Sequence, residues 1–375
     1  MNHPAVIPVR TIRAAVLRRR GVPLKIETLQ MEGPREDEIL VRLVASGVCH
    51  TDIGFIDDWS SAAQPVVLGH EGAGLVEEVG GGVKGIRPGD PVVLSYQSCG
   101  RCSPCRHGRP AHCLRLWEAN FGFSRLDGTN ALEKSGVRGH FFGQSSFATH
   151  CLATKRNVVP APRDLPLELL APLGCGLQTG AGTVLNSFKV PAGAGIAVFG
   201  TGAVGLAAVM AARIAGAEPI IGLDLRPRRL DLALELGATH AIDARRGRIA
   251  ARIAGIAREG VDFVVDTTGE PELVHLAVEV LKPGGRVALL TGDMTDRTYG
   301  QGKRAMGIVQ GDAVPQRFIP HLIDLYRAGQ FPFERLVKFY DFREINRAIA
   351  DSRKGGTIKP VLRIGQAAGP VHHLA

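Results

Sequence analysis

The glycine-rich stretch GTGAVG at residues 200–205 places the strongest constraint on how this chain folds. It follows an apolar run, Ala194–Phe199, that is typical of a buried strand, and it precedes an alanine-rich helical pattern that reaches Ala215. A second strand pattern ends in an acidic residue, Asp224, which lies 24 positions beyond Gly200. Strand, glycine-rich turn, helix and second strand in this order predict a parallel βαβ unit.

The same alternation continues along the chain. Further strands are expected at His240–Ile242, Val261–Asp266 and Gly285–Leu290, with a helix at Pro271–Leu281. Such alternation predicts an α/β domain with a doubly wound parallel sheet of the Rossmann type.

This context also predicts a nucleotide cofactor. Gly200, Gly202 and Gly205 allow a pyrophosphate to approach the amino terminus of the helix, and Asp224 can accept hydrogen bonds from an adenosine ribose. A 2′-phosphate would meet the carboxylate of Asp224, so NAD is predicted rather than NADP. An arginine just beyond it that reached the ribose would soften this preference; the candidates are Arg226, Arg228 and Arg229.

The amino-terminal half carries a different pattern. Thr11–Gln30 contains short strand-like runs, and Ile39–Gly47 alternates towards Cys49, which predicts antiparallel β structure. A chain of 375 residues is too long for one ordinary core, so two domains are expected. The composition shifts towards alanine, glycine and aliphatic residues after Cys175, which marks the boundary.

A second chemical motif is Gly69-His70-Glu71, which places an imidazole beside a carboxylate among glycines. Cys49 upstream and Cys175 downstream offer thiolates, so the three segments could form a Cys/His/Cys metal site with an open fourth position. Taken alone, a histidine near glycines is more often a structural residue.

Four further cysteines follow the spacing C-x₂-C-x₂-C-x₇-C, which indicates a closed structural zinc site; they are Cys99, Cys102, Cys105 and Cys113. An iron–sulfur cluster is the competing interpretation. Cys151 is left over and is predicted to be a small buried side chain.

Taken together, Gly69-His70-Glu71 with Gly74, Gly80 and Val83, Cys49-His50-Thr51-Asp52 and Gly174-Cys175-Gly176 resemble the zinc-containing alcohol dehydrogenases of the medium-chain dehydrogenase/reductase superfamily. The resemblance covers roughly Thr11 to Ile364. It implies a partly open, GroES-like β-barrel domain at 1–178 that carries both metal sites, an NAD-binding Rossmann domain at 179–314, and a return segment at 315–375 that completes the catalytic domain.

The resemblance also assigns roles to single residues. It implies two zinc ions (Zn²⁺) per chain, a catalytic one held by Cys49, His70 and Cys175 and a structural one held by the four clustered cysteines. Glu71 is implied as a carboxylate that can approach the catalytic metal. Thr51 is predicted to bond the alcohol and Asp52 to orient the ligand histidine, although Thr51 could instead be an N-cap. The implied cofactor contacts are His50, Thr179, Val204, Gly292, Val309 and Lys359.

The segments Gly174–Asn186 and Ile308–Tyr340 look most like the aryl-alcohol (benzyl-alcohol) branch of the family. The predicted reaction is therefore the reversible oxidation of a primary aromatic or allylic alcohol to the aldehyde. Trp117, Phe121 and Phe123 either wall a substrate pocket or pack as core, and Phe141 and Phe142 match positions that line the channel in relatives. The alternatives are a glutathione-adduct dehydrogenase, which needs a cationic pocket from residues such as Arg115, Arg125 or Arg138, and a family member that binds nucleotide without catalysis.

The formal net charge of +9 raises the question of nucleic-acid binding. The arginines occur in scattered groups without interleaved aromatic residues, so a solvated surface is predicted and no nucleic-acid partner. No apolar run spans a bilayer, and the first ten residues lack a signal-peptide core, so a cytoplasmic protein without membrane contact is expected. The predicted partner is a small-molecule alcohol or aldehyde, and the predicted assembly is a homo-oligomer, dimer first and tetramer second.

Overall fold

The computed structural model describes residues 9–58 and 65–365, and the chain divides into two compact units. The first unit holds the described residues of Met1–Gly108, Cys113–Cys175 and Leu336–Ala375, and the second holds Arg109–His112 and Gly176–Arg335. Most of the first ten residues, on which the expectation about a signal peptide rests, lie outside the described part.

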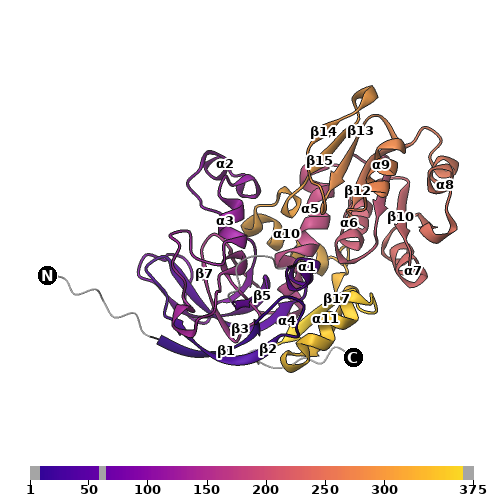
Figure 1. The fold of residues 1–375 in the computed structure, drawn as a ribbon. Coiled ribbons are helices and arrows are strands. Elements are labelled where there is room, and N and C mark those ends of the chain that lie inside the picture. Colours follow the sequence, from indigo (N-terminus) through magenta and orange to yellow (C-terminus); the bar gives the residue numbers. More distant parts are fainter. Residues whose placement is uncertain (1–8, 59–64, 366–375) are drawn as a thin grey trace. The chain divides into compact units, whose positions relative to one another are not determined.

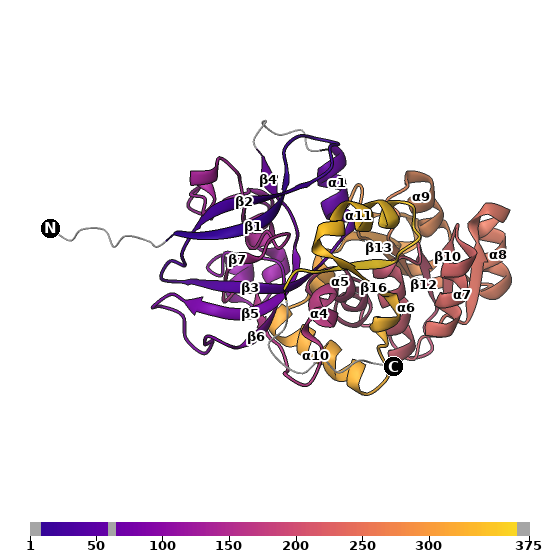
Figure 2. The same ribbon diagram turned by 90° about the horizontal axis from the view of Figure 1, so that it is seen from below.

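The first unit is built mainly from antiparallel β structure, as predicted, although β16 and β17 pair in parallel (Figure 2). One sheet has the order β2-β1-β4, and a larger one has the order β16-β17-β3-β5-β6-β8, with β7 paired to β3. Both strand orders remain open-ended among the described residues, in agreement with a partly open barrel. The strands are β1 Val9–Leu17, β2 Lys25–Glu32, β3 Glu38–Gly47, β4 Val66–Val67, β5 Glu71–Val79, β6 Pro91–Leu94, β7 His150–Thr154, β8 Val158–Pro160, β16 Val337–Asp341 and β17 Lys359–Arg363.

Alternating apolar side chains explain why β3 and its partners form a sheet with a buried face. Ile39, Val41 and Leu43 of β3 pack in one cluster with Val92 of β6 and Cys151 of β7. The helices of this unit are short, and they are α1 His50–Asp58, α2 Ser103–Arg106, α3 Leu116–Phe121, α4 Leu167–Leu170 and α11 Ile345–Arg353.

The second unit is the predicted doubly wound sheet (Figure 1). Its order is β11-β10-β9-β12-β13-β15-β14, in which all pairs are parallel except β14 with β15. The strand order therefore reverses at β9, between β10 and β12. The strands are β9 Ile196–Phe199, β10 Ile220–Asp224, β11 His240–Asp243, β12 Val261–Asp266, β13 Leu281–Leu289, β14 Arg297–Thr298 and β15 Arg304–Gly307.

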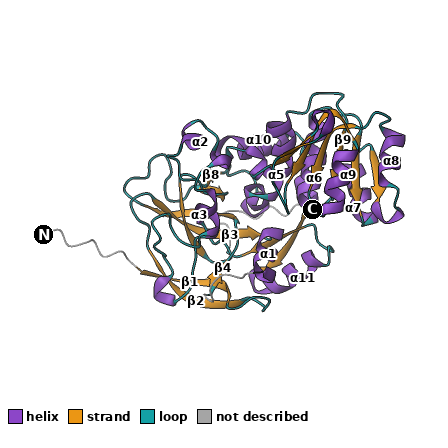
Figure 3. Ribbon diagram, turned by 45° about the horizontal axis from the view of Figure 1, so that its top comes forward, coloured by secondary structure: helices purple, strands orange, loops and turns teal. Residues whose placement is uncertain are grey.

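Helices connect the strands of this sheet and flank it (Figure 3). The core beneath them is aliphatic and includes Ile221, Val264 and Val287. The helices are α5 Gly176–Gly182, α6 Ala203–Ile214, α7 Pro227–Leu236, α8 Ile249–Ile256, α9 Pro271–Glu279 and α10 Pro315–Arg327.

The chain re-enters the first unit at Leu336, later than the predicted boundary at residue 315. The reason is α10, whose buried face includes Phe318, Ile319 and Leu322 and which contacts α5 of the second unit. Helix α11 begins at Ile345, after a 3₁₀ turn that a capping box between Asp341 and Glu344 closes. Among the described residues, none of the helices is both long and apolar enough to cross a membrane.

Candidate metal and cofactor sites

The first unit brings Cys49, His70, Glu71 and Cys175 together, with one ligand atom from each lying within 4.8 Å of all the others. Cys49 follows β3, while His70 and Glu71 lie where β5 begins, and the antiparallel register pairs Gly47 with Glu71. A side chain at residue 47 would meet the Glu71 carboxylate, because a Cβ there would lie 2.0 Å from Oε2. The glycine thus permits this close approach of two ligand-bearing segments.

Asp52 fixes the orientation of the ligand histidine, which is the contact predicted from the sequence. Its Oδ1 lies 3.0 Å from His70 Nδ1 and accepts a 3.0 Å hydrogen bond from Gly69 N, while its Oδ2 accepts a 3.0 Å bond from Cys49 N. His70 Nε2 is buried and has no hydrogen-bond partner among the described residues. An imidazole held at Nδ1 with Nε2 left for another ligand is the arrangement of a metal-binding histidine.

The local charges also fit a divalent cation. Burial lowers the pKa of His70, but the Asp52 carboxylate and Cys49 outweigh burial and raise it to about 10. Hydrogen bonding with Cys175 holds the pKa of the Cys49 thiol well below its usual value, although burial opposes this. These surroundings stabilise positive charge at the imidazole and negative charge at the sulfur. A divalent cation bound to both atoms would be stabilised in the same way. Two thiolates and a neutral imidazole are a ligand set of catalytic zinc sites.

Glu71 has a partner that the sequence did not predict. Lys359 Nζ donates to both of its carboxylate oxygens, at 2.9 and 3.0 Å, and both side chains are buried. Burial raises the pKa of Glu71, against the effect of Lys359. Lys359 was expected to bind a cofactor phosphate; the structure instead engages its ammonium group with this carboxylate, and the phosphate contact stays a prediction.

The four clustered cysteines also converge. Cys99, Cys102, Cys105 and Cys113 each place a sulfur within 4.8 Å of the other three. Backbone N–H groups of Leu114 and Cys105 lower the pKa of Cys102 to about 6, which favours the thiolate that zinc requires. Four sulfurs without an open position fit the closed structural site predicted from the spacing.

Two histidines near these cysteines have other partners. His107 Nδ1 lies 2.8 Å from the Ser103 carbonyl oxygen, and His112 Nε2 lies 3.0 Å from Asp312 Oδ1.

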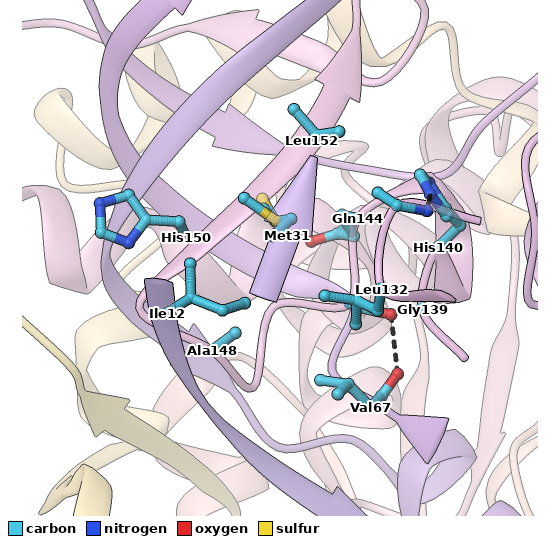
Figure 4. A pocket seen from close by; sticks show the side chains of 13 residues that line it. Ile12, Met31, Val67, Leu132, Gly139, His140, Gln144, Ala148, His150 and Leu152 are labelled. Atoms are coloured by element: carbon cyan, nitrogen blue, oxygen red, sulfur yellow. Dashed lines mark hydrogen bonds between the residues drawn. The ribbon is translucent and has the colours of Figure 1, made fainter. Parts of the chain in front are cut away.

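Cys151 is buried, as predicted, and burial raises the pKa of its thiol. It lines a cavity of about 20 Å³ in the first unit, with His140 and His150 on opposite sides (Figure 4). None of the predicted metal ligands lines this cavity, and its volume is about that of one water molecule. We therefore do not regard it as the substrate site.

In the second unit, the predicted cofactor residues gather where the parallel strands end. Gly200 follows β9, Asp224 ends β10, Gly292 follows β13 and Val309 follows β15. Ligands of doubly wound sheets bind at this carboxyl edge, beside the point where the strand order reverses.

Two glycines of the glycine-rich stretch that joins β9 to α6 have different roles. A Cβ at Gly205 would lie 1.8 Å from the carbonyl oxygen of Gly200, so this glycine allows α6 to pack on the strand. A Cβ at Gly202 would meet only Arg229 Nη1, at 3.8 Å, so space remains at the amino terminus of α6. Space beside exposed helix N–H groups is what a pyrophosphate requires.

Asp224 is held from three sides. Its Oδ2 accepts bonds from Thr201 N at 2.8 Å and Thr201 Oγ1 at 3.1 Å, and its Oδ1 accepts one of 2.9 Å from Arg226 N. Arg229 Nη1 lies 3.8 Å from Oδ2. The carboxylate is thus positioned before any ribose binds, and a cation lies beside it.

The remaining predicted contacts lie on helices. Thr179 is on α5 and Val204 is on the first turn of α6, and the two helices approach closely because Gly180 lies against the Val204 carbonyl. In the first unit, His50 and Thr51 begin α1. Asp52 bonds the backbone N–H of Cys49 there, and Thr51 Oγ1 lies 3.8 Å from Cys49 Sγ. This geometry favours the functional role of Thr51 over the N-cap.

Phenylalanine rings pack against His70. Phe142 stacks on the imidazole with ring centroids 4.3 Å apart, and Phe141 meets it edge-on at 5.5 Å. Phe121 and Phe123 join this cluster, as does Phe55, which the sequence analysis missed. The available signal was its position on α1, four residues after Thr51 and so on the same helix face.

Comparisons with known proteins agree with this arrangement. The family model for the alcohol dehydrogenase GroES-like domain matches residues 35–163, and that for zinc-binding dehydrogenase matches residues 203–306. A geraniol dehydrogenase from Castellaniella defragrans is 44% identical over 362 residues, which cover 93% of this chain and 97% of that protein.

Solved structures give the same result. Benzyl alcohol dehydrogenase from Acinetobacter calcoaceticus is 42% identical with a TM-score of 0.91, over 95% of this chain and 100% of that one. An alcohol dehydrogenase zinc-binding domain protein from Burkholderia ambifaria is 46% identical with a TM-score of 0.91, over 96% and 100%. With its two metal-ligand clusters and relatives of this identity over nearly its whole length, the chain belongs to the zinc-containing alcohol dehydrogenases of the medium-chain dehydrogenase/reductase superfamily.

Proposed function

We propose that the protein is an NAD-dependent dehydrogenase that oxidises a primary aromatic or allylic alcohol to the aldehyde and catalyses the reverse reduction. The observation that carries this proposal is the environment of His70, whose Nε2 is left for a metal ion while phenylalanine rings pack on the same imidazole. A polar reaction centre bordered by rings suits a hydroxyl group attached to an unsaturated, flat carbon skeleton.

Cys49, His70 and Cys175 would hold the zinc ion, which supplies a Lewis acid that makes an alcohol hydroxyl more acidic. NAD supplies the hydride acceptor, and Thr179 and Val204 are its proposed supports. Asp52 keeps the imidazole in one tautomer and orientation through Nδ1.

Thr51 Oγ1 is the proposed proton acceptor from the alcohol hydroxyl, since it lies 3.8 Å from Cys49 Sγ and therefore next to the predicted metal ligands. Gly54 lies one helical turn after Thr51 and has no side chain that could accept the proton from Thr51 and continue a proton relay. The proton therefore leaves through water or through His50, which is exposed at the start of α1.

The choice of substrate class draws support from two arginines. A glutathione adduct needs free cations for its carboxylates, but Arg125 is buried and paired with Glu38 and Glu32. Arg115 is paired with Glu118 and also donates to the Leu126 carbonyl oxygen. Relatives named for geraniol and for benzyl alcohol, which are allylic and aromatic primary alcohols, point in the same direction.

The test is a comparison of kcat/KM for benzyl alcohol, geraniol, 1-propanol and S-(hydroxymethyl)glutathione, each with NAD⁺ and with NADP⁺. Elemental analysis should find two zinc ions per chain, because the two cysteine-containing clusters share no ligand. We expect benzyl alcohol or geraniol with NAD⁺ to give the highest value. A preference for the glutathione adduct, or no turnover by protein that carries both zinc ions, would overturn the proposal. Light scattering of the same sample tests the proposed dimer against a tetramer.

A further inference from the structure

The segment between the clustered cysteines and β7 carries the rings of the aromatic cluster but little regular structure. Between Leu116–Phe121 (α3) and Phe141–Gly143 it contains one 3₁₀ turn, Glu133–Ser135, and no strand among its described residues. Phe121 is the last residue of α3, whereas Phe123 lies in the irregular part. This part is held by isolated backbone hydrogen bonds, such as that from Glu32 N to Ala131 O at 2.9 Å, and by side-chain contacts.

Arg125 makes the most extensive of these contacts. Its Nε and Nη2 donate to the two oxygens of Glu38, at 2.6 and 3.2 Å, and its Nη1 donates to Glu32 Oε2 at 3.0 Å. Only 8% of the Arg125 side chain and 7% of the Glu38 side chain are exposed. Glu32 ends β2 and Glu38 begins β3, so one guanidinium fastens the irregular segment to two strands. A bidentate guanidinium–carboxylate pair fixes the orientation of the two side chains as well as the distance between them.

This anchor lies two residues from a strained phenylalanine. Phe123 is buried and has a left-handed backbone with φ of 52°, and its carbonyl oxygen accepts a 2.9 Å bond from Asn130 Nδ2. A bulky residue keeps such a conformation only where its surroundings hold it there. Arg125, whose backbone N–H donates to Thr129 O at 2.9 Å, closes the turn that follows.

Phe123 transmits this constraint to the reaction centre. Its ring stacks on Phe141 with centroids 5.3 Å apart and planes 21° from parallel, and Phe141 meets the imidazole of His70 edge-on. Phe55 contacts both phenylalanines, at 5.7 and 5.1 Å. A shift of Phe123 would therefore be felt by the rings that border the proposed substrate position.

We infer that Arg125 is a positioning residue for substrate specificity: through its ion pairs with the buried Glu38 and the partly exposed Glu32 it holds Phe123 and Phe141 where they select flat unsaturated alcohols over small saturated ones. This inference rests on the proposed function. A buried ion pair adds little net stability compared with apolar side chains of similar volume, so its main effect here is on geometry.

The test uses the full-length, zinc-loaded protein and the ratio of kcat/KM for benzyl alcohol to that for 1-propanol. Arg125→Met combined with Glu38→Gln removes the pair without leaving an unpaired buried carboxylate, and Arg125→Lys keeps the charge but loses the fork. Arg10→Met is the matched control, because it removes a half-exposed arginine–glutamate pair, Arg10 with Glu77, from the same unit.

We expect the double variant to lower this ratio about 10-fold, mainly through a higher KM for benzyl alcohol, with the rate on 1-propanol little changed. Arg125→Lys should fall between it and wild type, and Arg10→Met should keep the wild-type ratio. An unchanged ratio in the double variant and in Arg125→Lys, or a parallel loss on both alcohols, would show that Arg125 is only structural and would overturn the inference. If the wild-type protein does not oxidise benzyl alcohol at all, it is the proposed function that fails.

Discussion

Replacing Asp52 with asparagine is the most direct test of the metal site, because this one side chain joins two ligand-bearing segments. Its carboxylate contacts three donors, at His70 Nδ1, Gly69 N and Cys49 N, each at 3.0 Å. Asparagine has one acceptor oxygen and one amide that only donates. Whichever way the amide turns, at least one backbone N–H or the imidazole N–H faces another donor.

The expected loss of zinc affinity follows from the number of donors that asparagine leaves without an acceptor. The least costly orientation keeps the oxygen at His70 and Gly69 and leaves Cys49 N without an acceptor, which costs about 1 to 3 kcal/mol for a buried donor. The variant also loses the negative charge that favours a cation at the imidazole. At about 1.4 kcal/mol for each factor of ten, zinc affinity and kcat/KM should fall roughly 10- to 100-fold, the range found for outer partners of metal ligands.

The assay is zinc retention against increasing chelator, measured beside kcat/KM and circular dichroism. The structural site is expected to keep its zinc, so Asp52→Asn should pass from two ions per chain to one at a lower chelator concentration than wild type. Asp90→Asn serves as the control, since Asp90 accepts a bond from the Arg87 N–H, pairs with the exposed Arg163 and lies outside the metal cluster. If Asp52→Asn keeps both ions and normal kcat/KM, Asp52 does not support the metal site.

Three further changes test other parts of the structure. Thr51→Val should lower turnover by roughly 100-fold while Thr51→Ser keeps most of it, measured with deuterated alcohol so that hydride transfer is observed; near-normal turnover in Thr51→Val would refute the relay. Asp224→Ser should narrow the preference for NAD⁺ over NADP⁺ in kcat/KM by roughly 10-fold, the value of one charge-assisted hydrogen bond, and an unchanged preference would contradict this. Burial lowers the pKa of His140 to about 3, so the folded protein keeps it neutral while the unfolded chain binds a proton below about pH 6.5. Its contribution to stability is therefore complete above pH 6.5 and is lost as the pH falls towards 3, by up to roughly 5 kcal/mol, and His140→Gln should flatten the curve of Tm against pH in that window.

The sequence predicted best where a structural rule is local. The strand Val261–Asp266 has the predicted bounds and the strand Ile220–Asp224 ends at the predicted residue, because each is a short, mainly apolar run closed by a polar residue. The contact of Asp52 with the ligand histidine could also be predicted, since Asp52 follows Cys49 in a recognisable motif. The boundary of the return segment was not predictable in this way. The amphipathic pattern of α10 indicates that one face of the helix is buried, but it does not indicate which unit covers that face.

Two ion pairs between distant positions had no signal in the sequence, unlike the predicted convergence of Cys49, His70 and Cys175. Lys359 and Glu71 are separated by 288 positions, and neither residue type nor spacing marks them as partners. The same holds for Arg125 and Glu38, which are 87 positions apart. Such pairs depend on the register of strands that meet only in the fold, and a buried charge becomes informative only when its partner is known.

The two carboxylates beside the predicted ligands of the catalytic metal have different partners, and this difference bears on how the site would bind an alcohol. Asp52 faces the imidazole of His70, so its charge strengthens a ligand. Glu71 lies among the ligand atoms themselves, where a free carboxylate would be a ligand for zinc and would compete with an alcohol. Lys359 donates to both oxygens of Glu71 and balances that charge, and its ammonium group also interacts electrostatically with Cys49 and Cys175. The thiolates of Cys49 and Cys175 would balance a divalent ion held there, and with Glu71 engaged by Lys359 we propose that this carboxylate would not compete with an alcohol for the ion.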